Sequence, residues 1–191
     1  MRILIIENDP VHIEAAKKQL AEHELTICAS YEEAEEVFLK GGGRTPTQKP
    51  EFDVVLTDLF LPPCWEGTQF RRSVGQKVLN NCLNAAISVV KDASPDREDS
   101  AIEETIRKSG LFQVPYGIIF SLLCIKQGIP VAIVSDANHH SGPFMWAMDL
   151  LAGKFTLDTI KFFTSDRLMN SDEDGNWVKT WDKALEFLMK D

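Results

Sequence analysis

Short apolar runs alternate with longer amphipathic stretches along the chain, and the two patterns predict different elements. The short runs are built mainly from Ile, Val, Leu and Phe, which is typical of strands buried on both faces of a parallel sheet. The predicted strands cover residues 2–6, 24–29, 52–57, 130–134 and 159–163.

Helices are predicted where apolar residues recur at helical spacing. The first opens at Pro10, with Asn8 or Asp9 as its N-cap, and the second is capped by Ser30 with Glu33 as the capping-box partner. The remaining predicted helices cover residues 75–90, 101–108, 115–127, 144–151 and 177–189. Polar loops or turns are predicted at 41–50, 92–100 and 172–176.

Strands and helices therefore follow one another in nearly strict alternation. This order predicts the α/β class, with a five-stranded parallel sheet covered by helices on both faces. Right-handed crossovers favour the doubly wound strand order 2-1-3-4-5. The chain, residues 1–191, is expected to form one domain with a helical insertion at about 64–114. Ligands of such sheets bind beyond the carboxyl ends of strands one and three.

The charge of the chain narrows the class of partner. Its 191 residues carry a net charge of −9. Because nucleic-acid binding draws on phosphate neutralisation, an acidic chain argues against a nucleic-acid partner, and a negative field also disfavours anionic membranes.

The first residues, MRILIIENDP, resemble neither a signal peptide nor a membrane span, because the apolar run is short and acidic residues follow at once. The four cysteines are widely spaced and form no CxxC pair. Reduced thiols in a cytoplasmic protein are the expectation.

Polar side chains gather at the ends of three predicted strands. Strand one is followed by Glu7, Asn8 and Asp9, and strand three by Asp58. The fourth strand is followed by a serine and an aspartate, Ser135 and Asp136. Clustered carboxylates repel one another, so a cation would stabilise them, and an oxygen-only donor set suits Mg²⁺. A carboxylate beside Mg²⁺ can also attack a phosphoryl group and form an aspartyl phosphate.

Three segments carry a specific resemblance. The stretches ILIIENDP, VVLTDLFLPP and VAIVSDA resemble strands one, three and four of a CheY-like response-regulator receiver domain, which has a flavodoxin-like fold. The resemblance covers residues 1–62 and about 115–191. It implies that Asp58 is the phosphoacceptor and that Glu7 and Asn8 occupy the acidic-pair positions. It also implies that Phe60 offers a backbone carbonyl to Mg²⁺ and that Ser135 is the switch residue.

The chain departs from the receiver pattern in three ways. Asn8 replaces a carboxylate, and an amide oxygen is a weaker ligand for a hard cation, so Mg²⁺ affinity should fall. The family's lysine at the end of strand five is not where it is expected: Lys161 comes about three residues too early, and Thr164 stands in its place. About fifty residues also follow strand three, where a handful is usual.

Each candidate also has a structural interpretation. Asp58 and Ser135 could cap the turns that follow their strands, and Glu7 and Asp9 could be acidic residues at a helix start, where the helix dipole favours them. His139 and His140 could lie in an exposed loop, or could serve in metal binding or proton transfer. With Asp9 and Asp136 they are additional candidates for the site.

The insertion could extend the core, form a dimer surface or act as a lid over Asp58. Cys64 and Trp65 follow Asp58 closely and are candidate lid residues. No base lies near Cys64 in the sequence, which disfavours a nucleophilic role for its thiol.

Three functions remain open. The first is a stand-alone phosphoprotein of a two-component phosphorelay, not an enzyme, which accepts a phosphoryl group on Asp58 with Mg²⁺ and has a histidine kinase or other signalling protein as its partner. The second is a pseudo-receiver that binds proteins without phosphorylation. The third is a metal-dependent enzyme on the same scaffold, using Asp58, Glu7 and His139 or His140. A homodimer is compatible with all three.

Overall fold

The computed structural model describes residues 1–40, 51–63, 74–109, 114–135, 161–164, 169–171, 175 and 177–190. The chain divides into two compact units. One comprises residues 1–61 and 115–191, and the other comprises residues 62–114. The second unit begins within two residues of the predicted insertion. The predicted helix at 144–151 lies outside the described residues.

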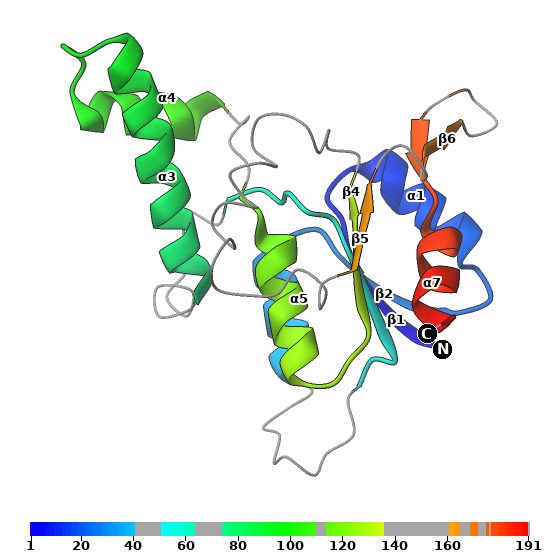
Figure 1. The fold of residues 1–191 in the computed structure, drawn as a ribbon. Helices are drawn as coiled ribbons and strands as arrows, with labels where there is room; N and C mark the ends of the chain where they lie inside the picture. The colour runs from blue at the N-terminus through cyan, green and yellow to red at the C-terminus, as the bar shows by residue number, and fades with distance from the viewer. Residues whose placement is uncertain are drawn as a thin grey trace. The chain divides into compact units, whose positions relative to one another are not determined.

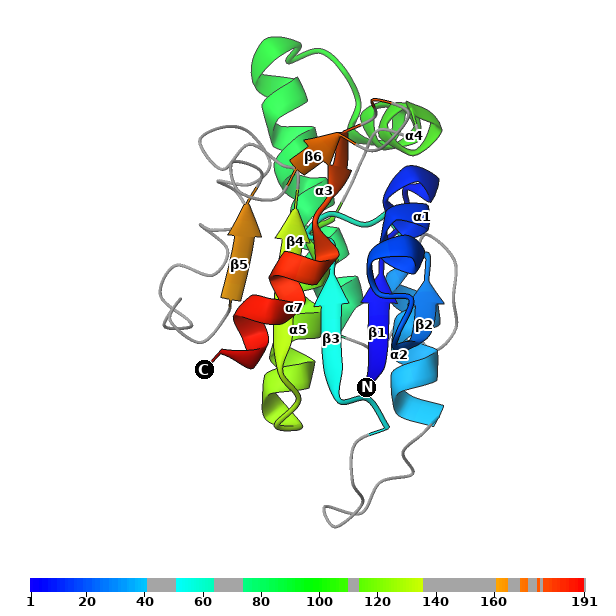
Figure 2. The same ribbon diagram turned by 90° about the vertical axis from the view of Figure 1, so that its right-hand side faces the viewer.

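The larger unit is built on a parallel sheet. Strand β1 (Arg2–Ile6) pairs with β2 (Glu24–Cys28) on one side and β3 (Val54–Thr57) on the other, and β4 (Val131–Ser135) pairs with β3. The predicted α/β class and the order β2-β1-β3-β4 are therefore confirmed. Strand β5 (Lys161–Thr164) lies parallel beside β4. Figure 2 shows that the arrowheads of these strands point the same way, so their carboxyl ends share one edge.

Helices cover both faces of the sheet. Helices α1 (Pro10–Gln19) and α7 (Trp181–Met189) lie on one face, and α5 (Tyr116–Lys126) lies on the other (Figure 1). Helix α2 (Tyr31–Lys40) packs against α5, with aromatic contacts between the two helices. The main apolar core lies between the sheet and the helices α1 and α7. Its fully buried members include Ile3, Ile5, Ala16, Ala132, Val134 and Trp181.

Local sequence explains where the first two helices start. The side chain of Asp9 accepts a hydrogen bond from the backbone N–H of Val11, and Pro10 supplies a φ angle suited to the first turn. At α2, Ser30 Oγ accepts from the N–H of Glu33 at 3.2 Å, while Glu33 Oε2 accepts from the N–H of Ala29 at 2.8 Å. Both predicted caps are confirmed, although the return bond of Glu33 goes to the residue before Ser30.

The smaller unit contains two helices, α3 (Val74–Ala93) and α4 (Asp99–Ser109). An ion pair of 2.5 Å between Lys91 and Asp99 joins the end of one helix to the start of the next. The predicted loop at 92–100 is too long, because both helices extend into it. Asp99 stands in the first turn of α4, where the helix dipole favours an acidic residue, and this helps to explain the earlier start of that helix.

The end of the chain corrects another prediction. Residues 177–189 were expected to form one helix, but Trp177–Lys179 is a strand, β7, paired antiparallel with β6 (Met169–Ser171). Helix α7 begins only after Thr180. Trp177 and Val178 belong to residue types that favour strands, and the pairing with β6 satisfies the backbone hydrogen-bonding groups of β7. The strand was not predicted because the helical periodicity of the residues that follow it was extended back to Trp177.

Within the part of the chain that the structure describes, no helix has both the length and the apolar character that a membrane crossing requires.

Candidate functional site

Glu7 and Asp58 lie side by side where β1 and β3 end. The backbone N–H of Asp58 donates to the carbonyl of Ile6 at 2.7 Å, and that of Glu7 donates to the carbonyl of Cys28 at 3.0 Å. The strand ladder thus continues to both residues and fixes their backbone. Glu7 is 1% exposed and Asp58 is 7% exposed. The prediction that these strand ends bring the two carboxylates together is confirmed.

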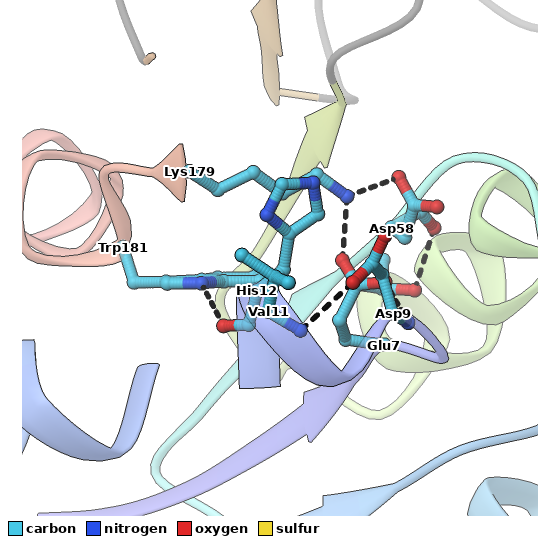
Figure 3. A network of polar contacts seen from close by, with 8 residues as sticks. Glu7, Asp9, Val11, His12, Asp58, Lys179 and Trp181 are labelled. Carbon is cyan, nitrogen blue, oxygen red and sulfur yellow. Dashed lines mark hydrogen bonds and ion pairs between the residues drawn. The ribbon is translucent and has the colours of Figure 1, made fainter. Parts of the chain in front are cut away.

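A lysine from the end of β7 joins the two carboxylates. Lys179 Nζ lies 2.5 Å from Oε2 of Glu7 and 2.8 Å from Oδ1 of Asp58 (Figure 3). The lysine side chain is itself 1% exposed. These three residues are called here the Glu7–Asp58–Lys179 triad.

Ion pairs hold the triad together at a buried position. Burial alone would lower the pKa of Lys179, but the adjacent carboxylates of Asp58 and Glu7 raise it, and the net shift is upward. The ammonium is therefore charged throughout the physiological range.

Strand β5 ends at Thr164, where the receiver pattern has its lysine, so that lysine is absent from the end of β5 as expected. The sequence analysis did not foresee that a lysine from another strand would contact the two carboxylates. Here the chain first forms the β6–β7 hairpin and then delivers Lys179 from the end of β7. The sequence carries only a weak signal for this strand, namely the two strand-favouring residues Trp177 and Val178 directly before Lys179.

Asp9 has a structural role. Its side chain is the N-cap of α1, and its own N–H donates to Oε1 of Glu7 at 2.9 Å. Because Asp9 is exposed and its carboxylate is engaged at the helix start, the capping interpretation is confirmed. The N–H bond also orients Glu7, whose second oxygen pairs with Lys179.

The other predicted residues lie near the same strand ends. Asn8 is half-buried, Phe60 is buried, and Ser135 is buried at the last position of β4. Asp136, His139, His140, Cys64 and Trp65 lie outside the described residues.

The start of α5 closes tightly over the backbone of Asp58. The N–H of Gly117 donates to the carbonyl of Leu59 at 3.1 Å, and Thr57 Oγ1 donates to the carbonyl of Asp58 at 2.9 Å. A Cβ atom at Gly117 would lie only 2.0 Å from the Asp58 carbonyl oxygen. Only glycine allows this approach, so α5 fixes the position of the Asp58 main chain.

Helix α1 supplies further residues that sequence reasoning missed. His12 is buried on this helix, and its carbonyl accepts from the indole Nε1–H of Trp181 at 3.0 Å. Gln19 forms hydrogen bonds on both sides of Thr180. Neither residue belongs to a recognisable motif, since both act through contacts with residues near the other end of the chain.

The donors at these strand ends suit a hard cation in kind. The carboxylates of Glu7 and Asp58, the amide oxygen of Asn8 and the main-chain carbonyl of Phe60 are all oxygen donors. No group of three or more His, Cys, Asp or Glu side chains that could hold a metal ion occurs among the described residues. A cation here would therefore depend on the amide and carbonyl oxygens and would share both carboxylates with Lys179.

The described cysteines are unreactive in character. Cys28, Cys82 and Cys124 are free thiols. Burial raises the pKa of Cys82 to about 11, and burial together with the charge of Glu33 raises that of Cys28 to about 12. At neutral pH these thiols stay protonated, which disfavours a nucleophilic role for them.

The chain shows no significant match to protein-family models, curated proteins or solved structures. The description of the site therefore rests on the structure alone.

Proposed function

We propose that this chain is a receiver-like signalling protein in which Asp58 accepts a phosphoryl group in the presence of Mg²⁺. The observation that carries the proposal is the placement of Lys179 between Asp58 and Glu7, in a buried position at the carboxyl ends of β1 and β3. A carboxylate can attack a phosphoryl group as a nucleophile, and a buried ammonium beside it can stabilise the charge of the group that is added.

The larger unit is proposed to be a flavodoxin-like, CheY-like domain with the five-stranded sheet order 2-1-3-4-5. The triad would then lie at the topological switch point of this sheet. Residues 62–114 would then be a helical insertion between β3 and α5.

The transfer step needs a nucleophile and charge neutralisation. An oxygen of the Asp58 carboxylate attacks the phosphorus of a phosphohistidine or an acyl phosphate. An O–P bond forms while the donor's P–N or P–O bond breaks. The donor leaves with the electron pair of that bond, and a departing imidazole takes up a proton from water. The Lys179 ammonium, already 2.8 Å from Asp58, is placed to pair with the oxygens of the added phosphoryl group.

Mg²⁺ would add neutralisation of the phosphoryl oxygens during transfer. Glu7, Asn8, Asp58 and the carbonyl of Phe60 are the groups that would hold it. Glu7 is pre-oriented for this role because the N–H of Asp9 binds its Oε1 atom.

The signal would leave the site through β4. Ser135 is buried at the end of this strand, next to β3, and is proposed to donate a hydrogen bond to the phosphoryl group on Asp58. The partner would be a histidine kinase or another signalling protein in the cytoplasm, and the phosphotransfer would serve signalling, not turnover of a substrate.

A pseudo-receiver that binds proteins without phosphorylation is the second candidate, and one observation favours it. Both oxygens of Glu7 already accept hydrogen bonds, one from Asp9 and one from Lys179. With Asn8 in place of a carboxylate, Mg²⁺ would have to compete with Lys179 for Asp58 and Glu7. The third candidate, a metal-dependent enzyme, depends on His139 and His140, which lie outside the described residues.

Intact-mass spectrometry after incubation with Mg²⁺ and a small phosphodonor distinguishes these candidates. Phosphorylation predicts that the wild-type protein gains one phosphoryl group, that omission of Mg²⁺ slows the gain, and that Asp58→Asn does not gain it. An unmodified wild-type protein would exclude the receiver function and leave the pseudo-receiver. Tight zinc or iron binding that is lost on changing His139 and His140 would instead favour the enzyme.

A further inference from the structure

The side-chain amide of Gln19 bridges the end of α1 and the junction of β7 with α7. Its Nε2 donates to the carbonyl of Lys179 at 2.9 Å. Its Oε1 accepts from the backbone N–H of Trp181 at 2.6 Å and, at a longer 3.4 Å, from that of Asp182. The one amide therefore holds the main chain on both sides of Thr180.

This junction needs an external partner. Thr180 is the N-cap of α7, but its side chain makes no capping hydrogen bond. The first N–H groups of a helix have no acceptor within the helix itself, and here Oε1 of Gln19 takes that role. Strand β7 is only three residues long, so its hairpin alone fixes the position of Lys179 weakly.

A second contact ties the same two segments together. The indole Nε1–H of Trp181 donates to the carbonyl of His12 at 3.0 Å, and this tryptophan is fully buried (Figure 3). Helix α1 therefore contacts the chain just after Lys179 at two points. The N-cap of the same helix is Asp9, whose N–H donates to Oε1 of Glu7.

We propose that Gln19 is the positioning residue of Lys179. Its amide sets the main chain at Lys179 relative to α1, and α1 is fixed at its other end beside Glu7. The ammonium and its carboxylate partners are thus held by opposite ends of one rigid helix, which gives the triad its geometry. That Gln19 affects phosphoryl acceptance by Asp58 rests on the proposed function. That Gln19 positions the Lys179 ammonium does not rest on it.

Two substitutions distinguish the hydrogen bond that Nε2 of Gln19 donates to Lys179 from the one that its Oε1 accepts from Trp181. Gln19→Met keeps the length of the side chain and removes both hydrogen bonds. Gln19→Glu at pH 8 keeps an acceptor for the Trp181 N–H but places a carboxylate oxygen against the carbonyl of Lys179. The glutamate variant should therefore retain the capping of α7 and its stability while it disturbs Lys179. Lys18→Met is the matched control, because Lys18 is the exposed neighbour of Gln19 on α1.

The test is the exchange rate of the Lys179 ammonium protons with water, measured by NMR on protein with ¹⁵N-labelled lysine and assigned with Lys179→Met. In the wild-type protein and Lys18→Met the signal should be protected. In both Gln19 variants exchange should be at least about tenfold faster. Unchanged exchange in the Gln19 variants, or an equal change in Lys18→Met, would overturn the proposal. If Gln19→Met does not fold, Gln19→Glu decides alone.

Beryllofluoride affinity in Mg²⁺ provides the functional measurement. The Gln19 variants should bind about tenfold more weakly than Lys18→Met, in the range usual for residues that orient a binding group. Wild-type affinity in both Gln19 variants would contradict the positioning role. If the wild-type protein itself does not bind beryllofluoride, the proposed function fails, and ammonium exchange still decides the role of Gln19.

Discussion

The ammonium of Lys179 lies 2.8 Å from the carboxylate of Asp58 and is 1% exposed, so the two charges form an ion pair inside the protein. Such pairs are sensitive to the loss of one partner, because the remaining charge stays buried without compensation. The triad should therefore be detectable in stability as well as in phosphoryl chemistry.

Removal of the ammonium should destabilise the fold strongly. Lys179→Met leaves Glu7 and Asp58 buried without their cation, and we expect a loss of about 3–5 kcal/mol in the free energy of unfolding in urea. Lys183→Met, an exposed position on α7, should change it by about 0.5 kcal/mol or less. Equal effects of the two substitutions would show that Lys179 carries no special charge interaction.

The contribution of Lys179 should also depend on pH in one direction. The pKa of Lys179 is raised in the folded protein, through Asp58 and Glu7, above the value of about 10.4 of an unfolded chain. Its stabilisation is then fully present below about pH 10 and is lost as the pH rises through the folded pKa. The difference in unfolding free energy between wild type and Lys179→Met should stay constant from neutral pH to about pH 10 and shrink above it. A difference that grows in alkali would contradict the ion pair.

Gly117 should be required for the geometry of Asp58. A Cβ atom at this position would meet the Asp58 carbonyl oxygen at 2.0 Å and the Leu59 Cα at 3.0 Å, and neither backbone atom can move aside freely. Gly117→Ala should cost about 1–3 kcal/mol in unfolding free energy and weaken beryllofluoride binding.

Gly128→Ala is the control for that substitution. Gly128 has open space around it but a φ of +68°, so alanine there should cost about 1 kcal/mol through backbone strain alone. It should leave beryllofluoride affinity unchanged. If both glycine variants weaken binding equally, a general loss of stability explains the effect.

A carboxylate at position 8 should strengthen cation binding. Asn8→Asp replaces an amide oxygen with a charged donor beside Glu7, and we expect Mg²⁺ affinity to rise about tenfold or more. Asp9→Asn is the control for a charge change at the neighbouring position, because asparagine preserves the N-cap of α1. Its Mg²⁺ affinity should not rise. Titration with Mg²⁺, followed by tryptophan fluorescence or calorimetry, gives both affinities. No gain in Asn8→Asp would place the cation away from this residue.

Local patterns were sufficient to predict most of the fold. Apolar runs predicted β1, β3 and β4, and the caps at Asp9 and Ser30 set the starts of α1 and α2. These signals depend on neighbours within a few residues, so they can be recognised without the structure. Glu7 and Asp58 could be placed together for the same reason, because parallel strands bring their carboxyl ends to one edge.

The rest depended on contacts between distant residues. Lys179 was missed because β7 has only three residues, pairs with the distant β6 and directly precedes a strongly periodic helix. Gln19 and His12 were missed because their partners lie near the other end of the chain. No local pattern distinguishes a glutamine that holds Lys179 from one exposed to solvent.

The central claim is that Asp58 itself becomes phosphorylated. An aspartyl phosphate is an acyl phosphate, and borohydride reduces it to homoserine, which marks the residue permanently. After incubation with Mg²⁺ and a phosphodonor, reduction and peptide mapping should find homoserine at position 58 in the wild-type protein and at no position in Asp58→Asn. Homoserine at another position, or none in the wild-type protein, would contradict the claim.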